Sequence, residues 1–183
     1  YFKTNKNLPA SVPKAKEKNL KIYIDENLFG EKLPEEKKLK NWKVDDFTEF
    51  FFKQSRRGDY VAIMAYIQKN KKNEKLLQKI RELIRNEKEL ATTLGYGPRF
   101  LHSTGQLHKG GAGNGMFIQI VSDDSKDLDI PGKAYSFRVL IESQAIGDYE
   151  SLLKHKRRVI RVNIGSDIEK GLHEFYKILK KSI

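Results

Sequence analysis

The sequence contains no cysteine among its 183 residues, so the chain can form no disulfide and offers no thiolate nucleophile or zinc–thiolate site. It also lacks any apolar run of about eighteen residues, the length that a membrane-spanning helix needs. The longest apolar stretch, "YVAIMAYI" at 60–67, suits a buried strand. No apolar signal core opens the chain. We therefore expect a cytoplasmic protein with no membrane partner.

Several ligand-binding signatures are absent as well. The sequence has no GxGxxG in the register of a dinucleotide-binding fold and no GxxxxGK[ST] phosphate loop. Histidine and carboxylate residues do not cluster at the spacings that metal sites use. We therefore expect neither a metal nor a cofactor.

Acidic residues are outnumbered by basic ones, 24 against 36, which gives a formal net charge of +12. The lysines are spread along the whole chain, and no recognition-helix, RNA-binding-sheet or zinc-finger signature accompanies them. A solvated basic surface is the favoured interpretation, and attraction of anionic metabolites is the second. A nucleic-acid-binding domain remains a less favoured alternative.

The chain divides into a short tail and one domain. Residues 1–19 are rich in lysine and proline and hold little that could pack, which predicts a linker or tail. Residues 20–183 are long enough for one domain with a substantial core. Because the chain opens on tyrosine rather than methionine, we expect it to be a fragment of a longer protein.

Hydrophobic patterning alternates between strand-like and helix-like segments. Strands are expected at 20–25, 59–67, 90–96, 116–122 and 158–164. Helices are expected at 45–57, 73–88, 98–109, 133–145, 148–156 and 166–179, with N-caps at Asp45 or Asp46, at Asn73 and at Ser166. This order predicts an α/β three-layer sandwich, with a mostly parallel sheet and helices on both faces. Ligands bind such sheets at the carboxyl ends of the strands.

A glycine-rich stretch, "GYGPRFLHSTGQLHKGGAGNG" at 95–115, follows one of these strands. If 98–109 is helical, His102, Gln106 and Lys109 share one face. An imidazole can transfer protons near neutral pH, and Arg99 near the helix N-terminus favours an anion such as a sugar phosphate. From spacing alone, a surface histidine–glutamine pair is the alternative to a catalytic site.

The other three histidines are expected to be structural or surface residues. His108 lies two positions from Gln106 and would point elsewhere, so it is interpreted as structural or solvent-facing. His155 and His173 lie in lysine-rich helical segments and are interpreted as surface residues.

The string "LATTLGYGPRFLHSTGQLHKGG" resembles the C-terminal part of phosphoglucose isomerases, above all the branch fused to transaldolase in bifunctional proteins. The similarity takes in "GDYVAIMAYI" and "DIPGKAYSFRVLIESQAIGDYESLLKHKRRVIRVNIG" and covers roughly residues 45–175. The resemblance implies a sugar isomerase domain that is usually paired with a second such domain.

The resemblance also implies a reaction: interconversion of glucose 6-phosphate and fructose 6-phosphate without metal or cofactor. In the family, a histidine in a His-Ser/Ala-x-x-Gln-Leu context opens the sugar ring, and His102 matches it. Lys170, followed by Gly-Leu, loosely matches the family's lysine and is the second candidate catalytic residue. Contacts to the sugar phosphate are expected from Arg99, Ser103, Thr104, Gln106 and Lys109. The histidine completes the active site of the neighbouring subunit, which implies a homodimer.

The sequence departs from the family at several points. The Glu-Ser-Asn-Gly segment that carries the family's base and the Ser-Phe-Asp-Gln-Trp-Gly segment near its C-terminus are both missing. The serine- and threonine-rich phosphate cradle belongs to the other sugar isomerase domain. We therefore expect this chain to be inactive alone and to need upstream domains of the same polypeptide. A regulatory module that binds sugar phosphates without isomerising them is the alternative.

Overall fold

The computed structural model describes residues 8–9, 11–25, 39, 41–123 and 127–183. A six-stranded sheet crosses the molecule in the order β1-β2-β6-β5-β3-β4. Strands β6, β5, β3 and β4 are parallel, and β2 and β1 extend the sheet in antiparallel fashion beyond β6. The strands are β1 Ala15–Glu17, β2 Leu20–Ile24, β3 Tyr60–Tyr66, β4 Ala91–Tyr96, β5 Gly115–Val121 and β6 Arg158–Asn163.

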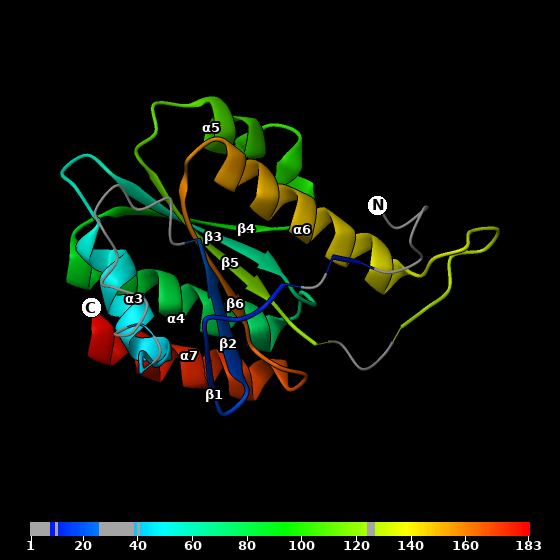
Figure 1. The fold of residues 1–183 in the computed structure, drawn as a ribbon, viewed down its shortest axis with the longest axis horizontal. Helices are drawn as coiled ribbons and strands as arrows, with labels where there is room; N and C mark the ends of the chain where they lie inside the picture. The colour runs from blue at the N-terminus through cyan, green and yellow to red at the C-terminus, as the bar shows by residue number, and fades with distance from the viewer. Residues whose placement is uncertain (1–7, 10, 26–38, 40, 124–126) are drawn as a thin grey trace.

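Helices cover both faces of this sheet, as Figure 1 shows. On one face lie α3 (Val44–Lys53), α4 (Lys71–Lys88) and α7 (Ile168–Ser182), and α7 packs against both of the others. On the other face lie α5 (Thr104–Gly110) and the long α6 (Phe137–Lys154). The expected α/β three-layer sandwich with a mostly parallel sheet is confirmed.

The apolar run of β3 reflects burial on both faces of the sheet. Successive side chains of a strand point to opposite faces. Val61 and Ile63 accordingly enter the core beneath α4 and α7, while Ala62 and Met64 enter the core beneath α6. A central parallel strand is therefore apolar at nearly every position.

The helices begin one to three residues away from the expected caps. Asn70, not Asn73, caps α4, and its side chain accepts the Asn73 N–H at 2.9 Å. Asp167, not Ser166, caps α7. Helix α3 begins after Lys43, whose N–H is accepted by the Asp46 carboxylate at 2.8 Å. Asparagine, aspartate and serine are all good N-caps, so sequence alone does not decide between Asn70 and Asn73 or between Ser166 and Asp167.

Three segments differ from the sequence-based expectation. The two helices expected on either side of Gly147 are one helix, α6, because Gly147 lies at an exposed position that packing does not constrain. The helix expected at 98–109 is divided into a 3-10 turn, η1 (Arg99–Leu101), and α5. Part of the expected tail at 1–19 forms β1, which pairs with β2, while residues 1–7 and 10 lie outside the described residues.

Candidate functional site

The stretch singled out from the sequence, residues 97–111, connects the end of β4 to α5 and is called the His102 segment below. It leaves the carboxyl end of the last strand of the parallel sheet. A cis peptide bond joins Gly97 to Pro98 at its start. The Gly97 N–H donates to the Ala65 carbonyl at 2.9 Å, so the segment begins tied to β3.

Buried residues hold the His102 segment against the sheet. The ring of Phe100 packs edge-on against Tyr66, with centroids 5.6 Å apart. Gly97 lies so close to Tyr66 that an added Cβ would stand 2.3 Å from the ring. Gly105 approaches the Phe100 carbonyl, with its hypothetical Cβ at 3.1 Å from that oxygen. These close approaches explain why the segment needs glycine.

His108 points into the core beneath this segment, so it is the structural histidine of the two. Its ring lies 4.8 Å from the Phe117 ring and 6.3 Å from the Tyr60 ring, centroid to centroid. Neither ring nitrogen has a hydrogen-bond partner in the described part of the chain. Burial lowers the pKa of His108, and the nearby Asp148 carboxylate opposes this shift only in part.

The residues expected to act on a substrate lie on the outer side of the same segment. Exposed side chains belong to Arg99, His102, Ser103, Thr104 and Gln106. Lys109 instead turns inward, and its Nζ lies 2.7 Å from Asp148 Oδ1 on α6. Because η1 ends before α5 begins, His102, Gln106 and Lys109 do not share one continuous helical face. The single helical face expected for these three residues is therefore wrong, although His102 and Gln106 both lie at the surface.

Lys170 lies elsewhere on the carboxyl edge of the sheet. It is exposed in the first turn of α7, after β6. Strand β6 is three positions from β4, and adjacent strands lie about 4.8 Å apart, so the sheet separates the origins of the two segments by about 14 Å. Helix α7, which carries Lys170, and helix α5, which follows His102, also lie on opposite faces of the sheet. The fold does not gather Lys170 and His102 into one site within a single chain.

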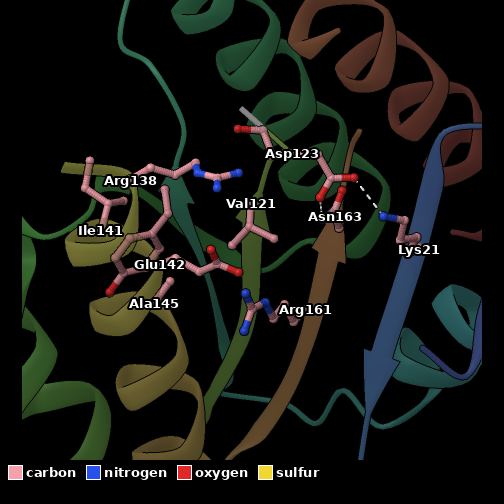
Figure 2. Close-up of a pocket in the computed structure, with 11 residues that line it drawn as sticks. Lys21, Val121, Asp123, Arg138, Ile141, Glu142, Ala145, Arg161 and Asn163 are labelled. Atoms are coloured by element: carbon pink, nitrogen blue, oxygen red, sulfur yellow. Dashed lines mark hydrogen bonds and ion pairs between the residues drawn. The ribbon is translucent and has the colours of Figure 1, made fainter. Parts of the chain in front are cut away.

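A pocket of about 320 Å³ opens at the carboxyl ends of β3, β5 and β6, beside α6 (Figure 2). We call it the Arg161 pocket. Lys21 of β2 and Asp123, just after β5, lie on one side, with Lys21 Nζ 2.7 Å from Asp123 Oδ2. The Asn163 amide donates to the other Asp123 oxygen at 2.6 Å. Burial works against ionisation of Asp123, but hydrogen bonds from Lys21 and Asn163 outweigh it and lower the pKa of that carboxyl.

Arg161 lies on the floor of this pocket, in the middle of β6. The residue is 8% exposed, and its Nε has no hydrogen-bond partner among the residues the structure describes. Burial lowers the pKa of the Arg161 guanidinium below its ordinary value. Directly opposite in the sheet register is Gln119 of β5, whose Nε2 donates to the Ala145 carbonyl at 2.9 Å and whose Oε1 is also unpartnered.

The sequence carried a signal for this pocket that the motif search passed over. Gln119 interrupts the apolar strand "MFIQIVS", and Arg161 interrupts "RVIRVNI". A central strand covered on both faces seldom holds an arginine or a glutamine, because burying such a group without a partner is costly. Polar residues inside otherwise apolar strands therefore mark positions where a site should be sought.

Neither a metal centre nor a membrane-spanning helix is found in the described ranges of the chain. No group of three or more histidine and carboxylate residues there could hold a metal ion. No helix in those ranges is long and apolar enough to cross a membrane.

Comparison with known proteins supports the fold alone. No family model matches the chain, and no curated protein matches it either. Among solved structures, the chain is similar to a hypothetical protein, TT0462, from Thermus thermophilus, with a TM-score of 0.65 and 14% sequence identity. The match covers 79% of this chain and 39% of that protein, so the chain corresponds to about two fifths of its length. At this identity the chain shares an α/β architecture with TT0462.

Proposed function

We propose that this chain is the C-terminal sugar isomerase domain of a phosphoglucose isomerase-like enzyme, which interconverts glucose 6-phosphate and fructose 6-phosphate in the cytoplasm. The proposal joins the resemblance of "GPRFLHSTGQLHKGG" to that family with one structural observation. The matching residue, His102, is exposed on a segment that buried side chains anchor to the sheet. Exposed polar groups on an anchored loop are a common arrangement for catalysis.

In this proposal His102 opens the sugar ring. The imidazole takes the proton of the C1 hydroxyl and passes it to the ring oxygen, so that the bond between C1 and that oxygen breaks and the aldehyde forms. Neighbouring donors on the same segment, Ser103, Thr104 and Gln106, would bind sugar hydroxyls, and Arg99 would attract the phosphate. Lys170 is the second candidate catalytic residue. It would act in a site that another chain completes.

The proposal requires a second protein surface. His102 stands at the surface and not in a cavity, and no segment of this chain matches the family's catalytic glutamate or its phosphate cradle. A substrate held only by exposed side chains would keep its hydration shell, and proton transfer at carbon needs a closed site. We therefore propose that upstream domains and a second subunit of a homodimer complete the site.

The test compares this chain with the complete gene product that contains it. The proposal predicts no glucose 6-phosphate isomerisation by the 183 residues alone and measurable turnover by the complete protein. His102→Gln in the complete protein should lower kcat with the closed-ring sugar at least about a hundredfold, the usual contribution of a general acid–base group. Turnover of an open-chain substrate should fall much less.

His173→Gln is the matched control, because His173 is an exposed histidine on α7 that the proposal gives no role. Equal losses in the two variants, or equal losses of His102→Gln with closed and open substrates, would contradict the ring-opening role. Isomerase activity of this chain alone would contradict the split site.

A sugar-phosphate-binding regulatory module is the second candidate, and the missing glutamate segment favours it. Such a module would bind glucose 6-phosphate, and the complete protein would still not isomerise it. Substrate turnover measured on the complete protein therefore separates the two.

A further inference from the structure

We propose that the Arg161 pocket binds the phosphate or carboxylate group of a small anionic metabolite, with Arg161 and Arg138 as the anion-binding residues. This site is separate from the His102 segment, and the proposal does not depend on the isomerase assignment.

The position of the pocket in the fold is the first observation. The connection from β3 to β4 runs through α4 toward one edge of the sheet, and that from β5 to β6 runs through α6 toward the other. The direction therefore reverses between β3 and β5, and Tyr66 and Val121, the last residues of these strands, line the pocket. A crevice at the carboxyl ends of strands, at such a switch point, is where α/β sheets bind small ligands.

Arg161 itself is the second observation. Arg161 is more than nine-tenths buried, its Nε lacks a partner, and no ion pair joins its guanidinium to a carboxylate within the described part of the chain. Its one described ring contact is with Tyr23, whose centroid lies 5.8 Å away. The Glu142 carboxylate faces this guanidinium without forming an ion pair with it, so the buried charge is only partly compensated, which is costly unless a ligand supplies the rest.

A second arginine on β6 shows how this fold neutralises a buried guanidinium for structure alone. Arg158 donates from both terminal nitrogens to Asp59, at 2.6 and 2.7 Å, and also to the Gln54 carbonyl at 2.7 Å. Arg161, three residues on and facing the pocket, has no such carboxylate in the described ranges. We attribute the difference to a ligand that takes the place of Asp59.

The charges around Arg161 identify the sign of that ligand. Lys21 and Asp123 pair at 2.7 Å, and among the other lining residues Arg161 and Arg138 stand against the single carboxylate of Glu142, while Asp127, outside the lining, pairs with Arg138 at the rim. Arg138, at the start of α6, is exposed at the rim, with its Nε 3.5 Å from Asp127. Figure 2 shows the Glu142 carboxylate and the Arg161 guanidinium turned toward the same space between α6 and β6. The lining itself carries three cationic and two anionic side chains, so it favours an anion.

The volume and the single surplus charge limit the ligand to a small metabolite. Pockets of about 300 Å³ suit small ligands. Glu142 repels a highly charged anion but can accept a hydrogen bond from a hydroxyl group of a singly or doubly charged one. Phosphate and carboxylate can each offer two oxygens to the paired N–H donors of an arginine, so both belong to the proposed class.

The test titrates the chain with inorganic phosphate and, separately, with glycolate, the smallest hydroxy acid, and follows backbone amide shifts by NMR. We expect saturable shifts at Val121, Ser122 and Asn163 with at least one of the two. The better probe indicates whether phosphate or carboxylate is preferred. Absence of saturable binding by both at millimolar concentration would overturn the proposal, as would shifts confined to other surfaces.

Variants assign the binding to the arginines. Arg161→Gln should weaken binding about tenfold or more, because a hydrogen bond to a charged group is lost. Arg138→Gln, at the exposed rim, should weaken it about threefold, and Glu142→Gln should tighten it about threefold by removing the competing carboxylate. Arg85→Gln on α4, an exposed arginine away from the pocket, is the control and should change nothing.

If Arg161→Gln fails to fold, the variants at the exposed residues Arg138 and Glu142 still decide the test. In that case tighter binding by Glu142→Gln together with weaker binding by Arg138→Gln supports the site. Weaker binding by Glu142→Gln, or an equal loss in Arg138→Gln and Arg85→Gln, overturns it. Because the measurement is binding to this chain, failure of the isomerase proposal would leave the result unaffected.

Discussion

The Lys109 ammonium lies 2.7 Å from the Asp148 carboxylate, and this contact joins α5 to α6. The Asp148 side chain is only 2% exposed, and its second oxygen accepts the Tyr66 hydroxyl at 3.3 Å. One buried carboxylate therefore connects the His102 segment, the long helix and the end of β3. Lys109 is held in this contact and does not project outward with His102.

Asp148→Asn should destabilise the fold by about 2–3 kcal/mol, because it leaves the half-buried Lys109 ammonium without its counter-charge. The free energy of unfolding in urea measures the loss. Glu150→Gln on the same helix is the control, since Glu150 is exposed. Adding Lys109→Met to Asp148→Asn should recover part of the loss. Equal stability of Asp148→Asn and Glu150→Gln would show that the ion pair contributes nothing.

His108 should make the fold less stable on mild acidification. Its native pKa is lowered by burial, while in the unfolded chain it titrates near its ordinary value of about 6.5. The unfolded state therefore binds a proton that the native state refuses, and the free energy of unfolding falls as the pH drops below about 6.5. His108→Phe should remove this dependence, whereas His173→Gln should keep it. Urea unfolding between pH 7.5 and about 5 is the measurement.

The helices and central strands could be predicted from the sequence because their hydrophobic patterns reflect which residues are buried. Leu77, Ile80 and Ile84 repeat at helical spacing and are all buried in α4, and β3 is apolar because both its faces are covered. Such signals are local. The pairing of β1 with β2 is different, because it depends on β6, which lies more than a hundred residues away in the chain.

The candidate site was predictable only in part. The motif placed His102 at the end of a strand and at the surface, and it separated His102 from His108. The inward turn of Lys109 depends on Asp148, a carboxylate 39 residues later, so no local pattern reveals it. The Arg161 pocket likewise gathers residues from β2, β5, α6 and β6.

Two helical glycines should respond to alanine in opposite directions. In α6, a Cβ on Gly147 would meet nothing within 4 Å, so Gly147→Ala should stabilise the fold by about 0.5–1 kcal/mol through helix propensity. In α7, a Cβ on Gly171 would stand 2.0 Å from the Ile164 carbonyl oxygen, so Gly171→Ala should cost about 3 kcal/mol or more by pushing the helix from the sheet. Thermal unfolding should show Tm rising in one variant and falling in the other, and a change of the same sign in both would refute the packing of α7.

The Asp59–Arg158 pair should make a pH-dependent contribution to stability that is lost at low pH. Burial disfavours the Asp59 carboxylate, but hydrogen bonds from the Arg158 side chain and the Arg56 N–H outweigh it and lower its pKa. Asp59→Asn should therefore cost about 3–5 kcal/mol at pH 7, where Arg158 would remain buried and unpaired.

Acid should reduce this difference between the wild type and Asp59→Asn. The stabilisation is complete above the unfolded-state pKa of about 3.9 and is lost as the pH falls through the lower native value. Urea unfolding at pH 7 and at about pH 3 should show that the free energies of unfolding of the two proteins become more similar as Asp59 of the wild type is protonated. A gap of constant size across that range would mean that the asparagine acts through lost packing and not through the charge, because only the charge titrates.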